Sequence, residues 1–226
     1  MRINDDLSQP VVVHAGKMNW VASRVAGVDR RMLFRIGDEV ARATSIVRYA
    51  PDSAFPHHMH TGGEEILVLD GVFEDEHGTY PAGSYFRNPP GTSHVPATKA
   101  GCTIFVRLWQ FRETDLVQIV RKPGEGRRMP PRLGASSSRL LFQDAHEKIS
   151  LEDWTSNAQV TLPSPDGLEI LVVRGTLRFG NEQLERQSWC RLPPGHELKA
   201  SVGPEGATVW VREAALVHAD APKLPN

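Results

Sequence analysis

The segment EEILVLDG (64–71) returns later in the chain as LEILVVRG (168–175), at an offset of 104 residues. The same offset carries the Pro-Pro-Gly sequence of 89–91 onto that of 193–195 without a gap. Internal similarity over such a distance indicates a duplicated structural unit. The sequence therefore predicts two related domains in tandem.

Short apolar runs between glycines and prolines continue this pattern along the chain. Examples are ATSIVRY (43–49), TIFVRLW (103–109) and TVWVREA (208–214). The 19 glycines and 17 prolines punctuate these runs, as turns do between antiparallel strands. Brief helical turns are expected at 37–43 and at 150–155. The pattern predicts an all-β fold of the sandwich, barrel or jelly-roll type.

The composition excludes several classes of partner. Lysine and arginine number 26 against 27 aspartates and glutamates, so no overall charge attracts nucleic acid or an anionic membrane. No apolar run approaches the roughly 18 residues of a membrane span, and the N-terminus lacks a signal-peptide pattern. A cytoplasmic protein is expected. Cys102 and Cys190 lie in strand-like segments and are interpreted as buried free thiols.

A Pro-, Gly- and Ser-rich segment separates the two halves. The sequence RKPGEGRRMPPRLGASSSR (121–139) carries six basic residues but no aromatic residues to stack on bases, so a solvated linker is favoured over a nucleic-acid patch. The expected organisation is an N-terminal metal-binding domain over 1–122, a linker over 123–138 and a C-terminal domain over 139–226.

Metal-ligating residue types gather around the first copy of the repeat. His58 and His60 are two apart, so on an extended chain both side chains point to one face. Glu64 follows a flexible Thr-Gly-Gly bend, and the Pro-Pro-Gly turn directs His94 back toward the same place. Imidazole and carboxylate together suit a divalent transition-metal ion. Each histidine alone is as readily a surface or core residue, but the four together predict a metal site.

These spacings resemble the two motifs of the cupin superfamily. The first motif, H-x-H, three residues, E, six residues, G, is matched from His58 to Gly71, with Asp52 where the family has a leading glycine. The second runs from Gly83 to His94, with Thr98 in place of the closing asparagine. The resemblance implies two jelly-roll barrels forming a bicupin, with His58, His60, Glu64 and His94 as metal ligands.

The repeat provides an internal comparison for these ligands. At the offset of 104, the four ligand positions are occupied by Leu162, Ser164, Leu168 and Leu198. The second barrel is therefore expected to lack a metal, and either to be mainly structural, with apolar side chains filling that space, or to keep a small apolar pocket there. Glu65 has a counterpart in Glu169, so Glu64 is interpreted as the ligand and Glu65 as a residue of the opposite strand face. Tyr85, Arg107 and Trp109 are candidates for pocket neighbours, but core or barrel-wall positions are favoured for them.

The run GGEEILVLDGVFEDEHGTYPAGSYFRNPPGTSH (62–94) is similar to the cupin-like domain of ChrR-type anti-sigma factors. The resemblance implies a zinc-binding regulatory module that responds to an oxygen species. A direct sigma-factor partner is not expected, because the helical domain that binds the sigma factor in that family has no counterpart here.

The same ligand set resembles that of iron(II) cupin dioxygenases acting on diketones or aromatic ketones, which is the alternative function. One divalent metal per chain is expected, zinc or iron(II) first and manganese or nickel next. The other expected partners are a small-molecule ligand at the metal and a second copy of the chain in a homodimer.

Overall fold

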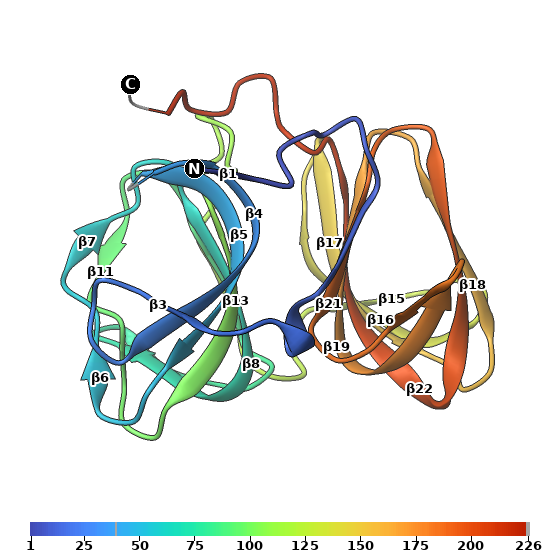
Figure 1. Cartoon of the computed structure of the whole chain (residues 1–226), viewed down its shortest axis with the longest axis horizontal. Helices are drawn as coiled ribbons and strands as arrows, with labels where there is room; N and C mark the ends of the chain where they lie inside the picture. Colours follow the sequence, from blue (N-terminus) through green and yellow to red (C-terminus); the bar gives the residue numbers. More distant parts are fainter. Residues whose placement is uncertain (39, 225–226) are drawn as a thin grey trace. The chain divides into compact units, whose positions relative to one another are not determined.

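The computed structural model describes residues 1–38 and 40–224. Its described residues form strands, apart from turns and one short 3-10 helix, η1 (Ala15–Lys17). The chain divides into two compact units, each described below by itself (Figure 1). No helix in the described part of the chain has the length and hydropathy of a membrane span. The expected all-β class is confirmed.

Unit 1 comprises Met1–Asp5, Asn19–Gly124 and the described residues from Val217 onward. Its strands are β1 (Arg2–Ile3), β3 (Val21–Ala22), β4 (Val28–Gly37), β5 (Ala41–Tyr49), β6 (Ser53–Ala54), β7 (His58–Met59), β8 (Glu64–Asp75), β9 (Gly78–Pro81), β10 (Tyr85–Asn88), β11 (Ser93–His94), β12 (Ala97–Thr98), β13 (Cys102–Leu108) and β14 (Ile119–Arg121).

The main sheet of unit 1 runs in the order β1-β4-β5-β13-β8-β10-β14, while β7 and β11 form a separate antiparallel pair. Strand β13 lies between β5 and β8, so that Phe105 is the partner of Ile46 on one side and of Leu67 on the other. Apolar side chains of these strands, including Val47, Ile66 and Val106, form one buried cluster. This core carries the site described below.

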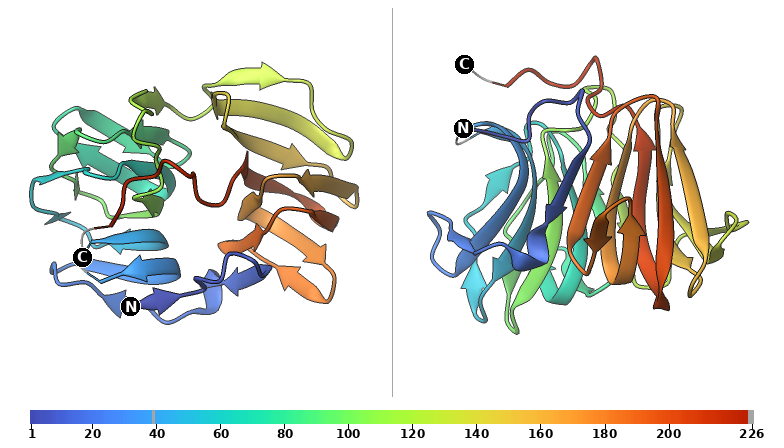
Figure 2. Two further views of the ribbon diagram at one scale, coloured as in Figure 1. Left: turned by 90° about the horizontal axis from the view of Figure 1, so that it is seen from above. Right: turned by 45° about the vertical axis from the view of Figure 1, so that its right-hand side comes forward.

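Unit 2 comprises Asp6–Met18 and Glu125–Leu216. Its strands are β2 (Val11–His14), β15 (Arg127–Met129), β16 (Ala135–Gln143), β17 (Glu147–Trp154), β18 (Gln159–Ser164), β19 (Leu168–Phe179), β20 (Glu182–Leu184), β21 (Ser188–Leu192) and β22 (His196–Ala214). They are ordered β15-β16-β17-β22-β19-β21-β2, with β18 on β22 and β20 on β19. The strands of residues 168–214, orange to red, run side by side in both views of Figure 2.

The repeat seen in the sequence is also a structural repeat. Strands β8 and β19 are both 12 residues long and begin 104 residues apart. Each pairs with a long strand C-terminal to its Pro-Pro-Gly turn: β13 in unit 1, after the short strands β11 and β12, and β22 in unit 2. Equivalent sequence segments thus occupy equivalent places in the two sheets.

The units depart from the expected ranges 1–122 and 139–226 at the N-terminus and in the linker. Strand β2 pairs with β21, Val12 opposite Cys190, which places residues 6–18 with unit 2 and covers an otherwise open sheet edge. Part of the expected linker 123–138 forms β15 and the start of β16. Backbone pairing, which composition does not report, accounts for both differences.

The two expected helical turns are wrong for the described residues. Residues 150–155 fall mostly in β17, where Ser150 pairs with Val211, and Ala41–Ala43 belong to β5. Residue 39, inside the other expected turn, lies outside the described residues. Cross-strand pairing decided both segments against their weak helical pattern.

Candidate metal centre

Two short strands bring the first and last of the predicted ligands together. Strands β7 and β11 are antiparallel, and His58 and His94 are direct partners in their register. The pairing continues to His60, whose backbone N–H donates to the carbonyl of Thr92 at 2.8 Å. The Pro-Pro-Gly turn expected to return His94 to the cluster therefore does so.

All four predicted ligands meet at one point. One ligand atom from each of His58, His60, Glu64 and His94 lies within 4.8 Å of the others. The imidazole centroids are 5.0 Å apart for His58 and His60, 5.0 Å for His58 and His94, and 4.6 Å for His60 and His94. His60, Glu64 and His94 are buried, and His58 is partly exposed.

The backbone conformation explains why aspartate can replace glycine at the start of the first motif. Asp52 stands where cupins have a leading glycine, and its φ of 56° lies in the left-handed region that glycine adopts most easily. Aspartate is one of the few other residues that tolerates this conformation. The departure from the motif therefore preserves the local chain direction.

The Nε2 atoms of two histidines are directed at the carboxylate of Glu64. They lie 3.1 Å from Oε2 for His60 and 3.2 Å for His94. Although these distances suit an ion pair, neither nitrogen has a partner with hydrogen-bond geometry among the described residues. Buried nitrogen atoms without such a partner are uncommon, and a bound cation accounts for them.

The outer ring nitrogen of His60 has an acceptor that defines its tautomer. Nδ1 of His60 lies 2.9 Å from the hydroxyl oxygen of Thr92, which donates its own proton to the carbonyl of Pro89 at 2.7 Å. The Thr92 oxygen therefore accepts from Nδ1–H, and Nε2 of His60 keeps its lone pair. A metal ion requires this lone pair.

The other two histidines follow the same arrangement. Nδ1 of His58 lies 3.0 Å from the carbonyl of Pro56, and Nδ1 of His94 lies 3.1 Å from Oδ2 of Asp75. A carbonyl and a carboxylate only accept hydrogen bonds here, so both histidines are protonated at Nδ1. All three imidazoles can thus present Nε2 to a common ion, and the residues fit a metal.

The electrostatics of the cluster match a cation site. Burial opposes ionisation of Glu64, but the His60 and His94 rings outweigh it and lower the pKa of this carboxyl. Burial alone would lower the pKa of His94, whereas its contacts with Asp75 and Glu64 outweigh this and raise it to about 9. Burial lowers the pKa of His58. The carboxylate is charged at neutral pH, ready to ligate a metal.

A cavity of about 360 Å³ inside unit 1 opens onto this cluster. His58, His60 and Glu64 form part of its wall, and apolar residues of β4, β5 and β13 form much of the rest. Trp109 also lines the cavity and packs on the bend before β8, where a Cβ added at Gly62 would come within 2.2 Å of its ring. Small-molecule sites combine these features: a concave apolar wall with a few polar groups.

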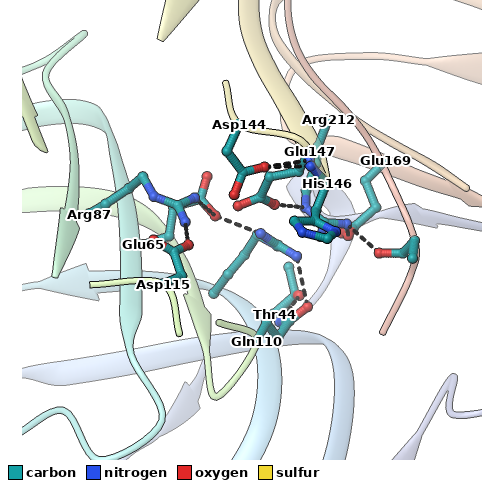
Figure 3. A network of polar contacts seen from close by, with 12 residues as sticks. Thr44, Glu65, Arg87, Gln110, Asp115, Asp144, His146, Glu147, Glu169 and Arg212 are labelled. Atoms are coloured by element: carbon teal, nitrogen blue, oxygen red, sulfur yellow. Dashed lines mark hydrogen bonds and ion pairs between the residues drawn. The ribbon is translucent and has the colours of Figure 1, made fainter. Parts of the chain in front are cut away.

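Glu65 faces away from the cluster, as neighbours on a strand do. Its carboxylate accepts from the Tyr85 hydroxyl at 3.0 Å and from Arg107 at 2.5 Å. Arg87 pairs with Asp115 nearby (Figure 3). These side chains are buried and belong to the sheet wall, as the sequence interpretation of Tyr85 and Arg107 proposed. Trp109, in contrast, lines the cavity.

Unit 2 repeats the buried polar contacts of the sheet wall, but its described residues form no metal cluster. Arg212 donates to Glu147 at 2.9 Å and to Glu169 at 3.3 Å (Figure 3). Trp189 also donates to Glu169, at 3.3 Å. Glu169 is the counterpart of Glu65 at the repeat offset. The buried polar contacts of this strand face are therefore present in both copies.

The positions equivalent to the metal ligands are packed in unit 2. Leu162 and Leu198 are direct partners in the register of β18 and β22, as His58 and His94 are in unit 1. These two leucines and Leu168 are fully buried members of the unit 2 core. The fourth position, Ser164, is buried and donates to the carbonyls of Leu192 and Pro193.

Three contributors to the site were not predicted from the sequence. Thr92 and Asp75 orient His60 and His94, and the Asn88 amide lies 3.3 Å from Oε2 of Glu64. Thr92 and Asn88 lie within the second cupin motif, so their positions were a usable signal. Asp75 lies 19 residues from His94, and no spacing pointed to it.

Comparison with known proteins agrees with the fold. Residues 8–112 match the family described as ChrR Cupin-like domain. A putative dioxygenase from Nostoc punctiforme is similar, with a TM-score of 0.72 and 15% identity over 97% of this chain and 88% of that one. A bacterial pirin in complex with nickel(II) from Escherichia coli has a TM-score of 0.69 and 12% identity, over 92% of this chain and 100% of the pirin. An oxalate decarboxylase variant from Bacillus subtilis has a TM-score of 0.60 and 12% identity, over 95% of this chain and 81% of the decarboxylase. A comparison with curated sequences finds no match.

Proposed function

We propose that the chain is a cupin and a mononuclear metal protein that acts on a small organic molecule, because residues 8–112 match the ChrR Cupin-like domain and its fold is similar to that of a putative dioxygenase. The observation that carries this proposal is the opening of the His58, His60, Glu64 and His94 cluster onto a cavity. A purely structural ion would be enclosed by protein ligands, whereas this cluster borders space for a ligand.

The proposed reaction class is oxygenation by a metal-dependent dioxygenase, the activity named for the Nostoc punctiforme neighbour. Three neutral imidazoles and one carboxylate leave a divalent ion with a charge of about +1 and, in an octahedral geometry, two positions for exogenous oxygen ligands. When bound, iron(II) would supply one-electron and dioxygen chemistry. Iron(II) is therefore the first candidate, followed by zinc, manganese and nickel.

The protein residues have separate roles in this proposal. His58, His60, Glu64 and His94 hold the ion, while Thr92 and Asp75 keep two of the imidazoles in the ligating tautomer. The apolar cavity wall excludes water from the bound molecule.

Metal analysis of the purified protein tests the assignment first. The double variant His58→Ala/His94→Ala should lose the divalent metal measured by elemental analysis. His77→Ala is the matched control, because His77 is an exposed histidine in the same unit. Full metal content in the double variant would refute the ligand set.

The reaction class needs its own measurement. Anaerobically loaded iron(II) protein should consume oxygen when β-diketones or aromatic ketones are added, and the double variant should not. Absence of substrate-dependent oxygen uptake in fully loaded protein would reject the dioxygenase while leaving the metal centre in place.

Regulation is the second candidate function, and the match to the ChrR Cupin-like domain favours it. In this form the metal centre binds an oxygen species or small ligand and signals to a protein partner, without turnover. The discriminating outcome is a ligand-dependent change in the unfolding temperature of the metal-loaded protein without oxygen uptake or product.

We extend the proposal to the architecture: each unit is a cupin barrel, and the chain is a bicupin with a metal in unit 1 alone. The equivalent strands β8 and β19 and the leucines at the ligand positions of unit 2 support it. A metal content of one ion per chain, unchanged by substitutions at Leu162, would agree with this arrangement.

A further inference from the structure

Two polar groups in the cavity wall, the Arg30 guanidinium and the Tyr49 hydroxyl, have no hydrogen-bond or ion-pair partner among the described residues. Arg30 and Tyr49 both line the cavity. The Nε atom of Arg30 is shielded from solvent without a hydrogen bond, and its guanidinium makes no ion pair within the described part of the chain. Tyr49 is 8% exposed, and its hydroxyl makes no hydrogen bond to a described residue. A shielded Nε–H is ordinarily satisfied, so Arg30 points to a ligand, and the Tyr49 hydroxyl is available to bind the same ligand.

The strand register places these two groups on one face. In the β4–β5 pair, Arg30 is the partner of Val47 and Tyr49 is the partner of Val28. Arg30 and Tyr49 are thus diagonal neighbours, positions whose Cβ atoms are usually about 7 Å apart. Their neighbours Asp29 and Arg48 lie on the opposite face and pair with each other at 2.6 Å. One small molecule can contact both groups.

Arg24, Arg35 and Asp38 also line the cavity, but most of the remaining wall is apolar and selects the body of such a molecule. Val25, Phe55, Ile104, Val106 and Leu108 contribute apolar surface to the cavity. A guanidinium without a protein carboxylate binds a ligand carboxylate well, because its planar N–H groups match the two oxygens. Burial and the charge of Glu64 raise the pKa of Tyr49, so its hydroxyl is a hydrogen-bond donor at neutral pH.

We propose that the cavity binds a small monocarboxylate with an apolar aryl or alkyl body, whose carboxylate pairs with Arg30 and one of whose oxygens accepts a hydrogen bond from Tyr49. The molecule would lie beside the His58, His60, Glu64 and His94 cluster, so the inference rests on the proposed function of that site. The volume of about 360 Å³ is near the lower end for ligand cavities, which favours a single ring or a short chain.

Calorimetric titration of the full metal-loaded chain with phenylacetate and its neutral isostere phenylacetamide tests the proposal. Phenylacetate should bind about tenfold tighter or more, the preference expected of a charge-assisted hydrogen bond. Arg30→Gln should abolish the preference and Arg30→Lys should retain part of it. Tyr49→Phe should weaken phenylacetate binding roughly threefold to tenfold, as the loss of one neutral hydrogen bond does.

Arg48→Gln is the matched control, because Arg48 lies in the same strand pair but faces the opposite side. It should leave the preference for phenylacetate unchanged. Equal binding of phenylacetate and phenylacetamide by the unaltered protein would overturn the proposal, whatever the variants do. So would a full preference retained in folded Arg30→Gln.

Elemental analysis of the same samples separates this inference from the proposed function. Protein that binds metal but shows no carboxylate preference would reject the inference and leave the metal centre intact. Protein that holds no metal yet prefers phenylacetate through Arg30 would reject the metal centre and support the carboxylate subsite.

Discussion

Thr92→Val should weaken metal binding although Thr92 contacts no ion. The Thr92 hydroxyl accepts from Nδ1 of His60 at 2.9 Å and donates to the Pro89 carbonyl at 2.7 Å. Valine has nearly the same shape but no acceptor, so the Nδ1–H of buried His60 loses its partner. An unsatisfied buried donor costs about 1–3 kcal/mol. Loss of such an orienting contact typically lowers metal affinity by roughly 10- to 100-fold.

Competition with a chromophoric zinc chelator measures this change. Thr92→Ser is the rescue variant, because it keeps the hydroxyl and should stay within about threefold of the original affinity. The unfolding temperature of the metal-free proteins provides the structural control. Thr92 also holds the turn before β11, so a loss of affinity matched by a similar loss of metal-free stability would mean loosening of the turn. Unchanged affinity in Thr92→Val would refute the orienting role.

Three further predictions follow from burial and charge. Because the pKa of His94 is raised to about 9, a proton competes with the metal ion for its Nε2 atom. In a chelator titration, metal affinity should therefore rise by roughly tenfold per pH unit up to about pH 9. An affinity that does not change with pH would contradict this. Burial raises the pKa of Cys102 and of Cys190 to about 12, so the native thiols should not react with a disulfide reagent near neutral pH and should react after denaturation. Leu198→Ala should lower the free energy of unfolding by roughly 2–5 kcal/mol without reducing metal content, and an unchanged midpoint in denaturant would argue against its core position.

The repeat and the strand pattern were sufficient to predict an all-β chain, because alternation and turn residues are local properties. The pairing of β2 with β21 was not predictable from them, since Val12 meets Cys190 across most of the chain and its sequence, VVVH, fits any open edge. The helical interpretation of 150–155 was wrong because pairing with β22 outweighs a capping pattern. Long-range backbone pairing determined what local signals left undecided.

The candidate site was predictable as far as its ligands repeat a known spacing. The residues that orient or surround these ligands were harder to predict from the sequence. Asp75 reaches His94 because β12, shortly after His94, pairs with the end of β8, Ala97 opposite Glu74. Arg30 and Tyr49 belong to the site through the register of β4 and β5. Neither β4 nor β5 carried a sequence motif that pointed to the site. Which groups share a cavity is a property of the folded sheet, not of the spacing along it.

The two units together indicate what an ion in unit 1 would be for. Both units keep the buried contacts of Glu65 and Glu169 with arginine, on the face of the repeated strand away from the ligand positions. On the other face, unit 2 has leucine where unit 1 has His58 and His94, and it is fully packed. The same strand arrangement is therefore reached without metal ligands. Retaining three histidines and a carboxylate around a cavity stabilises the fold less than leucine would, because buried polar groups lose solvation. The fold alone thus does not require the cluster in unit 1, whereas the proposed metal centre accounts for it.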